Sequence, residues 1–216
     1  MREKIAEILL KRKAVTLDAK EPYTFVSGIR SPIYCDNRLL TSYPKDRKEI
    51  CKAFIEKVKE MDAEVIAGTA SSAISWAAWI AAKLDKPMVY IRKKGKDYGK
   101  EQLIEGGDIN GKKVVVIEDL VSTGGSSMNA VQSCRDAGGE VVAMVAIFTY
   151  EFEKAESKFE EGRCKTVFLT DFSTLVEVAA EKGYIEEEHL KLVKEWNSDP
   201  SGWGPKHGFP LGEKKN

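Results

Sequence analysis

Residues 114–127 read VVVIEDLVSTGGSS, and this stretch decides the fold. The unbroken β-branched run at 114–117 is typical of a strand that is buried on both faces. Two acids end the strand, and hydroxyl residues and two glycines then lead into a helical pattern over 127–137 that stops at two further glycines. The stretch therefore predicts a strand, a loop and a helix that belong to a parallel sheet.

The sequence on both sides of this stretch also alternates between predicted strands and predicted helices. Apolar runs predict further strands at 65–68, 88–91, 141–148 and 166–169. Amphipathic or apolar patterns predict helices at 2–13, from Pro44 to about 58, and at 72–84, 174–182 and 186–196. We therefore expect an α/β fold with a mostly parallel central sheet flanked by helices.

Composition narrows the range of partners and compartments. The 216 residues carry 34 Lys and Arg against 34 Asp and Glu, which argues against binding nucleic acid or an acidic membrane through bulk charge. The four cysteines are far apart and form no CxxC pair, so we expect free thiols in a reducing compartment. The apolar stretch 73–82 is too short to span a bilayer, and the first residues do not form a signal peptide. We expect a cytoplasmic protein with no membrane or nucleic-acid partner.

The loop after residues 114–117 has the composition of a sugar-phosphate site. In open α/β sheets, ligands bind at the carboxyl ends of the strands. Glycines and a helix N-terminus expose N–H groups to an anion, and serine and threonine hydroxyls add donors. Glu118 and Asp119 would repel phosphate, but they can accept hydrogen bonds from sugar hydroxyls. The alternative to a ligand site is an ordinary capped turn between a strand and a helix. The sequence has no GxxxxGK[ST] motif and no GxGxxG motif after a predicted strand, which argues against the common nucleotide-binding loops.

Four segments match motifs of one known group of enzymes. Residues 117–126 resemble the phosphoribosyl pyrophosphate (PRPP) signature of type I phosphoribosyltransferases, and 25–38 (FVSGIRSPIYCDNR) resemble an N-terminal hood motif. Residues 65–70 are similar to the pyrophosphate-side loop, and 90–99 (YIRKKGKDYG) to the mobile catalytic loop. Together the four segments resemble the orotate phosphoribosyltransferases. This resemblance implies a type I phosphoribosyltransferase fold in a single domain, residues 1–197, with a small hood largely from residues 1–40. Residues 198–216, rich in Gly, Pro and Lys, are expected to form an irregular tail.

The resemblance also implies a reaction in de novo pyrimidine synthesis: orotate and PRPP give orotidine 5′-monophosphate and pyrophosphate. Mg²⁺ is implied as cofactor, bound mainly by pyrophosphate and ribose oxygens, with few or no protein ligands. Lys96 and Asp119 are the implied catalytic residues, and the mobile loop is expected to be shared between the subunits of a homodimer. The implied PRPP-binding residues are Arg92, Lys93, Lys96, Tyr98, Glu118, Asp119, Leu120, Val121, Ser122, Thr123, Gly124, Gly125 and Ser126. The implied orotate-binding residues are Ser122, Ser27, Gly28, Ile33 and Tyr34, the last two through the backbone.

Two other functions are compatible with a PRPP site. The chain could be a phosphoribosyltransferase for another base, although the hood motif at 25–38 argues against this. It could also be a non-catalytic PRPP-binding regulator of nucleic acid. The absence of a basic excess and of an appended helix-turn-helix argues against that function. One departure from the family pattern is Tyr98, where relatives usually have histidine; a phenol can donate a hydrogen bond to pyrophosphate but carries no positive charge.

Overall fold

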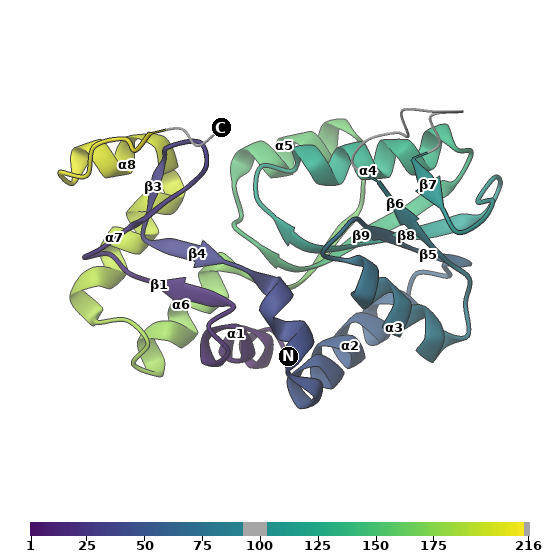
Figure 1. The fold of residues 1–216 in the computed structure, drawn as a ribbon, viewed down its shortest axis with the longest axis horizontal. Helices are drawn as coiled ribbons and strands as arrows, with labels where there is room; N and C mark the ends of the chain where they lie inside the picture. Colours follow the sequence, from purple (N-terminus) through teal and green to yellow (C-terminus); the bar gives the residue numbers. More distant parts are fainter. Residues whose placement is uncertain (93–102, 214–216) are drawn as a thin grey trace.

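A computed structural model describes residues 1–92 and 103–213. Its centre is a six-stranded sheet with the strand order β10-β9-β8-β5-β6-β7 (Figure 1). The strands are β5 (Val65–Thr69), β6 (Met88–Ile91), β7 (Ile104–Glu105), β8 (Lys113–Val121), β9 (Glu140–Thr149) and β10 (Thr166–Asp171). All neighbours pair in parallel except β6 and β7, which are antiparallel. The predicted mostly parallel sheet is confirmed.

Helices cover both faces of the sheet because successive side chains of each strand point to opposite sides. On one face, Val115 and Ile117 of β8 belong to the larger apolar cluster, which also contains residues of α1 (Arg2–Lys11), α2 (Pro44–Lys59), α3 (Ile74–Leu84) and α6 (Phe172–Glu181). On the other face, Val114 and Val116 pack with α4 (Gly125–Asp136) and α5 (Glu153–Glu161). The central strand is therefore buried on both sides, as its composition predicts.

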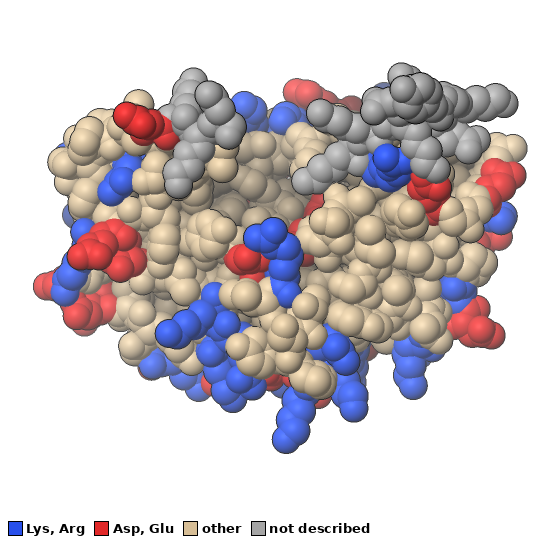
Figure 2. All heavy atoms as spheres, viewed as in Figure 1, with Lys and Arg blue, Asp and Glu red and all other residues tan. Residues whose placement is uncertain are grey.

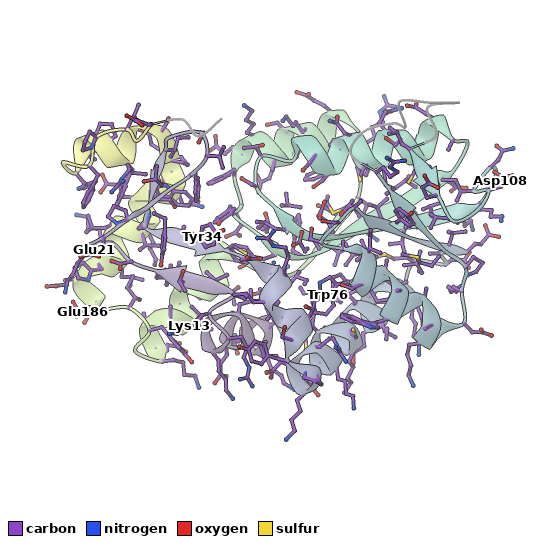
Figure 3. All side chains as sticks on the ribbon, in the orientation of Figure 1. Lys13, Glu21, Tyr34, Trp76, Asp108 and Glu186 are labelled. Atoms are coloured by element: carbon purple, nitrogen blue, oxygen red, sulfur yellow. The ribbon has the colours of Figure 1, made fainter. Side chains whose placement is uncertain are left out.

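The hood lies beside the sheet, at the left of Figure 1. It contains two antiparallel strand pairs, β1 (Val15–Leu17) with β4 (Ile33–Cys35) and β2 (Tyr23–Thr24) with β3 (Arg30–Ser31). The 3₁₀ helix η1 (Asn37–Ser42) then leads back toward α2. Figure 3 shows Tyr34 on β4 in the hood and Trp76 on α3 below the sheet.

The C-terminal helices hold the hood in place. Trp196 of α7 (Glu187–Ser198) is fully buried, and its indole N–H donates a hydrogen bond of 3.2 Å to the carbonyl oxygen of Arg30. Its ring also packs edge-on against Phe25 and Tyr150, which come from the hood and from the segment after β9. The hood therefore shares one apolar core with the rest of the chain.

The expectation of an irregular tail over 198–216 was wrong for residues 200–206, which form α8 (Pro200–Lys206). Asp199 caps this helix by accepting a hydrogen bond from the Gly202 N–H, and Pro200 occupies its first turn. Trp203 is buried and stacks on Phe209, which supplies the apolar contact that the glycine-rich composition concealed. Helix α5 is also absent from the predicted helices, because only Ala155 and Phe159 of its residues are buried.

Within residues 1–92 and 103–213, no helix has the length and apolar character needed to cross a bilayer.

Candidate active site

A cavity of about 870 Å³ lies where the hood faces the carboxyl ends of the central strands. Figure 2 shows this face of the molecule, which is hollowed between the hood and the sheet. Strands β5, β6 and β8 end at the cavity, and η1 and α4 form two of its walls. The position is the one at which open α/β sheets bind ligands. The polar side chains that line it are Asp36, Asn37, Arg38, Thr69, Ser71, Ser72, Arg92, Glu118, Asp119, Ser122, Thr123, Ser126, Asn129, Gln132, Ser133 and Asp136.

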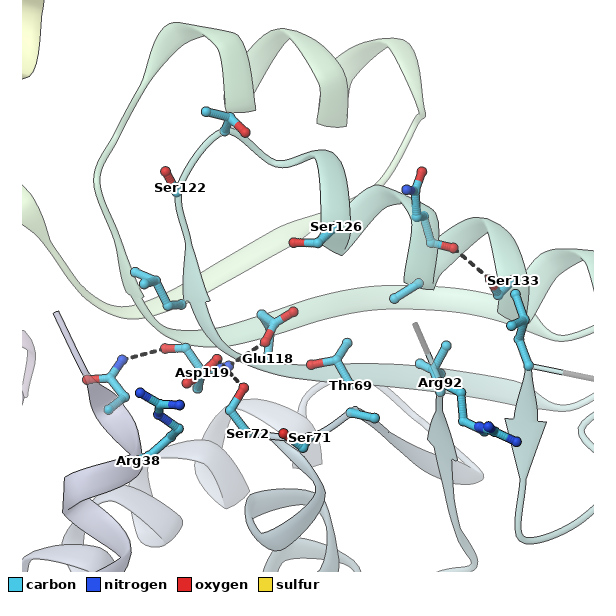
Figure 4. A pocket seen from close by; sticks show the side chains of 18 of the residues that line it. Arg38, Thr69, Ser71, Ser72, Arg92, Glu118, Asp119, Ser122, Ser126 and Ser133 are labelled. Carbon is cyan, nitrogen blue, oxygen red and sulfur yellow. Dashed lines mark hydrogen bonds between the residues drawn. The ribbon is translucent and has the colours of Figure 1, made fainter. Parts of the chain in front are cut away.

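The two adjacent acids differ in environment (Figure 4). The Glu118 side chain is 6% exposed and accepts a hydrogen bond of 2.9 Å from the Asp119 N–H. Burial, together with the hydrogen bond and charge of Asp119, raises the pKa of Glu118 to about 8. Asp119 instead accepts a hydrogen bond of 2.8 Å from the Ser72 hydroxyl. At neutral pH Glu118 therefore favours its protonated form, and it lies beside the Asp119 side chain that Ser72 orients, a combination suited to binding neighbouring hydroxyl groups.

The predicted phosphate-binding loop, residues 122–126, follows these acids directly. Ser122, Thr123 and Ser126 line the cavity, and Gly124 has a positive φ of 72° immediately before α4 begins. A Cβ atom on Gly124 would lie 3.1 Å from the Cα of Ala155, so α5 packs closely against this turn. The first N–H groups of α4 have no partner within the helix and carry its positive dipole end, which favours an anion.

The other predicted PRPP-binding residues do not all line the cavity. Leu120 and Arg92 line the cavity, whereas the Val121 side chain is fully buried in the core. Lys93, Lys96 and Tyr98 lie outside the described residues. Arg92 follows β6, and its Nη1 is 3.3 Å from a carboxylate oxygen of Glu105.

The predicted orotate-binding residues of the hood do not meet this cavity. Ser27, Gly28, Ile33 and Tyr34 are all described, and none of the four lines it. The Ile33 side chain is fully buried in the core, which leaves only its backbone for a ligand, and Tyr34 is 42% exposed with its ring 5.5 Å from that of Tyr23. Their assignment to orotate remains a prediction.

Several lining residues lie just outside the predicted set. The Asn37 amide donates a hydrogen bond of 2.7 Å to the carbonyl oxygen of Asp119 and so joins the hood to the acidic pair. Ser72 holds the Asp119 carboxylate, and Arg38 lies beside it (Figure 4). All three lie within or next to segments that carry the family resemblance, at 25–38 and 65–70, so their position in the sequence was the available signal.

Comparison with known proteins decides the family. Residues 44–181 match the sequence model of the phosphoribosyl transferase domain. An orotate phosphoribosyltransferase of Listeria innocua is 50% identical over 204 residues, which cover 94% of this chain and 98% of that protein. The chain belongs to the orotate phosphoribosyltransferase family. This membership confirms the predicted family, the predicted fold and the predicted enzymatic activity.

Solved orotate phosphoribosyltransferases share the fold. The crystal structure of the enzyme from Aeropyrum pernix has a TM-score of 0.72 and 26% identity, and the match covers 84% of this chain and 99% of that one. The crystal structure of the Mycobacterium tuberculosis enzyme in complex with PRPP has a TM-score of 0.64 and 26% identity, with coverage of 81% and 98%.

Proposed function

We propose that this orotate phosphoribosyltransferase binds PRPP across the carboxyl ends of β5, β6 and β8 and transfers its phosphoribosyl group to orotate. The products are orotidine 5′-monophosphate and pyrophosphate, in de novo pyrimidine synthesis. The observation that carries the proposal is the meeting of three features in one cavity: the acidic pair, the hydroxyl-rich start of α4, and Ser71 and Ser72 next to Arg92. A related enzyme crystallised with PRPP supports the same ligand.

Each part of the cavity has a role in the transfer. Ser122, Thr123, Ser126 and the N–H groups of Gly124 and Gly125 would bind the 5′-phosphate. Glu118 and Asp119 would accept hydrogen bonds from the ribose hydroxyls and fix the ring. The bond from C1′ to the pyrophosphate oxygen breaks, the bond from C1′ to N1 of orotate forms, and the N1 proton is released. The Asp119 side chain would stabilise positive charge on the ribose and is our candidate acceptor for that proton.

The residues present fit Mg²⁺ that enters with PRPP. The cavity offers hard oxygen donors in the Asp119 carboxylate and the serine hydroxyls, which suit this ion. Among the described residues, the side chains close enough to form a three-ligand cluster are Glu186, Glu188 and His189, which lie in and just before α7 and not in the cavity. We therefore propose that the pyrophosphate oxygens supply most of the ligands. Bound in this way, the ion would neutralise the charge that develops on the leaving pyrophosphate.

We propose further that the protein is a cytoplasmic homodimer in which Lys93, Lys96 and Tyr98 contact the pyrophosphate in the neighbouring subunit's site. Lysine at position 96 would neutralise the leaving group in the transition state.

Mixed dimers test whether the loop that carries Lys96 acts in the site of the neighbouring subunit. A chain with Lys96→Ala and a chain with Asp119→Ala should each be inactive alone. If the loop is shared, random mixing should restore about a quarter of the wild-type activity, because half of the dimers then contain one intact site. A loop that acts within its own subunit would restore none.

The reaction itself is tested by the loss of orotate absorbance in the presence of PRPP and Mg²⁺. We expect Asp119→Asn to lower kcat/KM for orotate by roughly 10²–10⁴-fold, the range for loss of a catalytic acid or base. The control is Asp62→Asn, because Asp62 is an exposed carboxylate that pairs with Lys113, outside the cavity. Full activity of Asp119→Asn would exclude the proposed role of this carboxylate.

A further inference from the structure

The cavity has a cationic side chain on each of two walls. Among the described residues that line it, the cationic ones are Arg38 and Arg92. Arg92 follows β6, close to the loop of Ser71 and Ser72, whereas Arg38 belongs to η1 of the hood and lies beside Asp119 (Figure 4). The two guanidinium groups therefore flank the acidic pair from opposite directions, and Arg38 has no part in the roles assigned above.

The Arg38 guanidinium is held in a fixed orientation. Its Nε and Nη2 donate to the two carboxylate oxygens of Asp36 at 2.7 and 2.8 Å, a bidentate pair. Asp36 also accepts a hydrogen bond from the Arg38 backbone N–H and so caps η1. The Arg38 side chain is still 67% exposed, and within the described part of the chain its Nη1 donates to no other residue. A guanidinium oriented in this way can bind a second carboxylate without first losing side-chain freedom.

The neighbouring Asn37 fixes the distance between Arg38 and the reacting centre. Its side chain is 1% exposed, and its amide donates to the Asp119 carbonyl oxygen at 2.7 Å. The start of η1 is therefore tied directly to the end of β8. A ligand whose ribose contacts Glu118 and Asp119 would have Arg38 within reach of a substituent on the hood side.

Reaction geometry places the base on that side. In a displacement at C1′, the new bond forms on the face opposite the leaving group. With the pyrophosphate placed at Ser71, Ser72 and Arg92, next to the segment 65–70 that resembles the pyrophosphate-side loop of the family, orotate would approach from the hood. Orotate differs from uracil by one carboxylate, and recognition of a planar carboxylate suits a guanidinium fork. We propose that Arg38 binds the carboxylate of orotate and makes the enzyme select orotate over bases without this group. This proposal rests on the placement of PRPP proposed above.

Product binding tests the assignment without turnover. Orotidine 5′-monophosphate carries the carboxylate and uridine 5′-monophosphate does not, so calorimetric titration of both nucleotides isolates the carboxylate contact. We expect Arg38→Gln to weaken binding of orotidine 5′-monophosphate by roughly 10- to 100-fold, the range for a charge-assisted hydrogen bond, and to leave uridine 5′-monophosphate binding unchanged. Arg38→Lys should give an intermediate loss, because it keeps the charge but not the fork.

The matched control is Arg2→Gln. Arg2 has a similarly exposed side chain, 63%, and also pairs with an aspartate, Asp171, but it lies on α1 outside the cavity. This variant should bind both nucleotides as the wild type does. Equal weakening of both nucleotides by Arg38→Gln would overturn the proposal in favour of a structural role for the Asp36 pair. Unchanged binding of both would overturn it as well. Conversion of orotate by the wild type is measured separately, so failure of the carboxylate contact does not mimic failure of the reaction.

Discussion

Replacement of Glu118 by glutamine should make the protein more stable and less active. The carboxyl group is 6% exposed, and burial together with the neighbouring Asp119 raises its pKa from 4.5 to about 8. In the unfolded chain the group ionises near its ordinary value, so the folded state binds a proton that the unfolded state releases. The contribution of Glu118 to the free energy of unfolding is therefore fully present below pH 4.5, decreases as the pH rises from there, and levels off above pH 8.

The size of the effect follows from the same pKa values. A tenfold change in an ionisation constant corresponds to about 1.4 kcal/mol. Ionisation of Glu118 in the unfolded state then lowers the free energy of unfolding of the wild type by about 3 kcal/mol at pH 7 and by about 5 kcal/mol at pH 9, as upper bounds. Glutamine carries no charge, and its carbonyl oxygen can still accept the hydrogen bond that the Asp119 N–H donates at 2.9 Å. Glu118→Gln should therefore be more stable than the wild type by an amount that grows with pH.

Urea denaturation between pH 5 and 9 measures this difference. The control is Glu21→Gln, because Glu21 is exposed in the hood and its replacement should not change the pH dependence (Figure 3). In the same preparations, Glu118→Gln should raise KM for PRPP, because hydrogen bonds donated by the ribose hydroxyls favour the ionised form of Glu118, and an amide cannot supply this stronger, charged acceptor. If the wild-type unfolding free energy is constant over this range and Glu118→Gln gains nothing, the buried-acid argument is wrong.

Three further replacements test other parts of the structure. Gly124→Ala must place alanine at a φ of 72° and close to Ala155, so we expect the free energy of unfolding in urea denaturation to fall by about 1–3 kcal/mol and KM for PRPP to rise. Unchanged stability would contradict the close packing of this turn. Ser72→Ala removes the 2.8 Å hydrogen bond to Asp119 and should raise KM for PRPP about fivefold in initial-rate assays, and an unchanged KM would show that the hydroxyl does not orient the carboxylate. Trp196→Phe removes the indole donor to the Arg30 carbonyl and part of a fully buried ring, and it should lower the unfolding free energy by about 2–4 kcal/mol; equal stability would mean that neither the hydrogen bond nor the ring packing contributes to holding the hood.

Local patterns in the sequence determine most of the architecture. The β-branched run at 114–117 predicts a strand buried on both faces, and Val114 and Val115 indeed belong to the two different cores. The glycines at 138–139 correctly predict the end of α4. These features can be predicted from the sequence because each is a short-range consequence of side-chain shape and backbone freedom. Helix α8 was missed because its stability comes from Trp203 packing on Phe209, a tertiary contact that glycine-rich composition does not reveal.

The candidate site divides in the same way. The sequence alone determined the family and the presence of the acidic pair and the predicted phosphate-binding loop, because these residues are contiguous and their chemistry follows from residue type. Only the tertiary structure decided that Glu118 is buried and prone to hold a proton while Asp119 is held by Ser72. It also decided that Asn37 and Arg38 of the hood, rather than Ser27 and Gly28, line the cavity. The physical reason is that burial, pKa and the approach of distant segments depend on how the hood packs against the sheet, which no local pattern encodes.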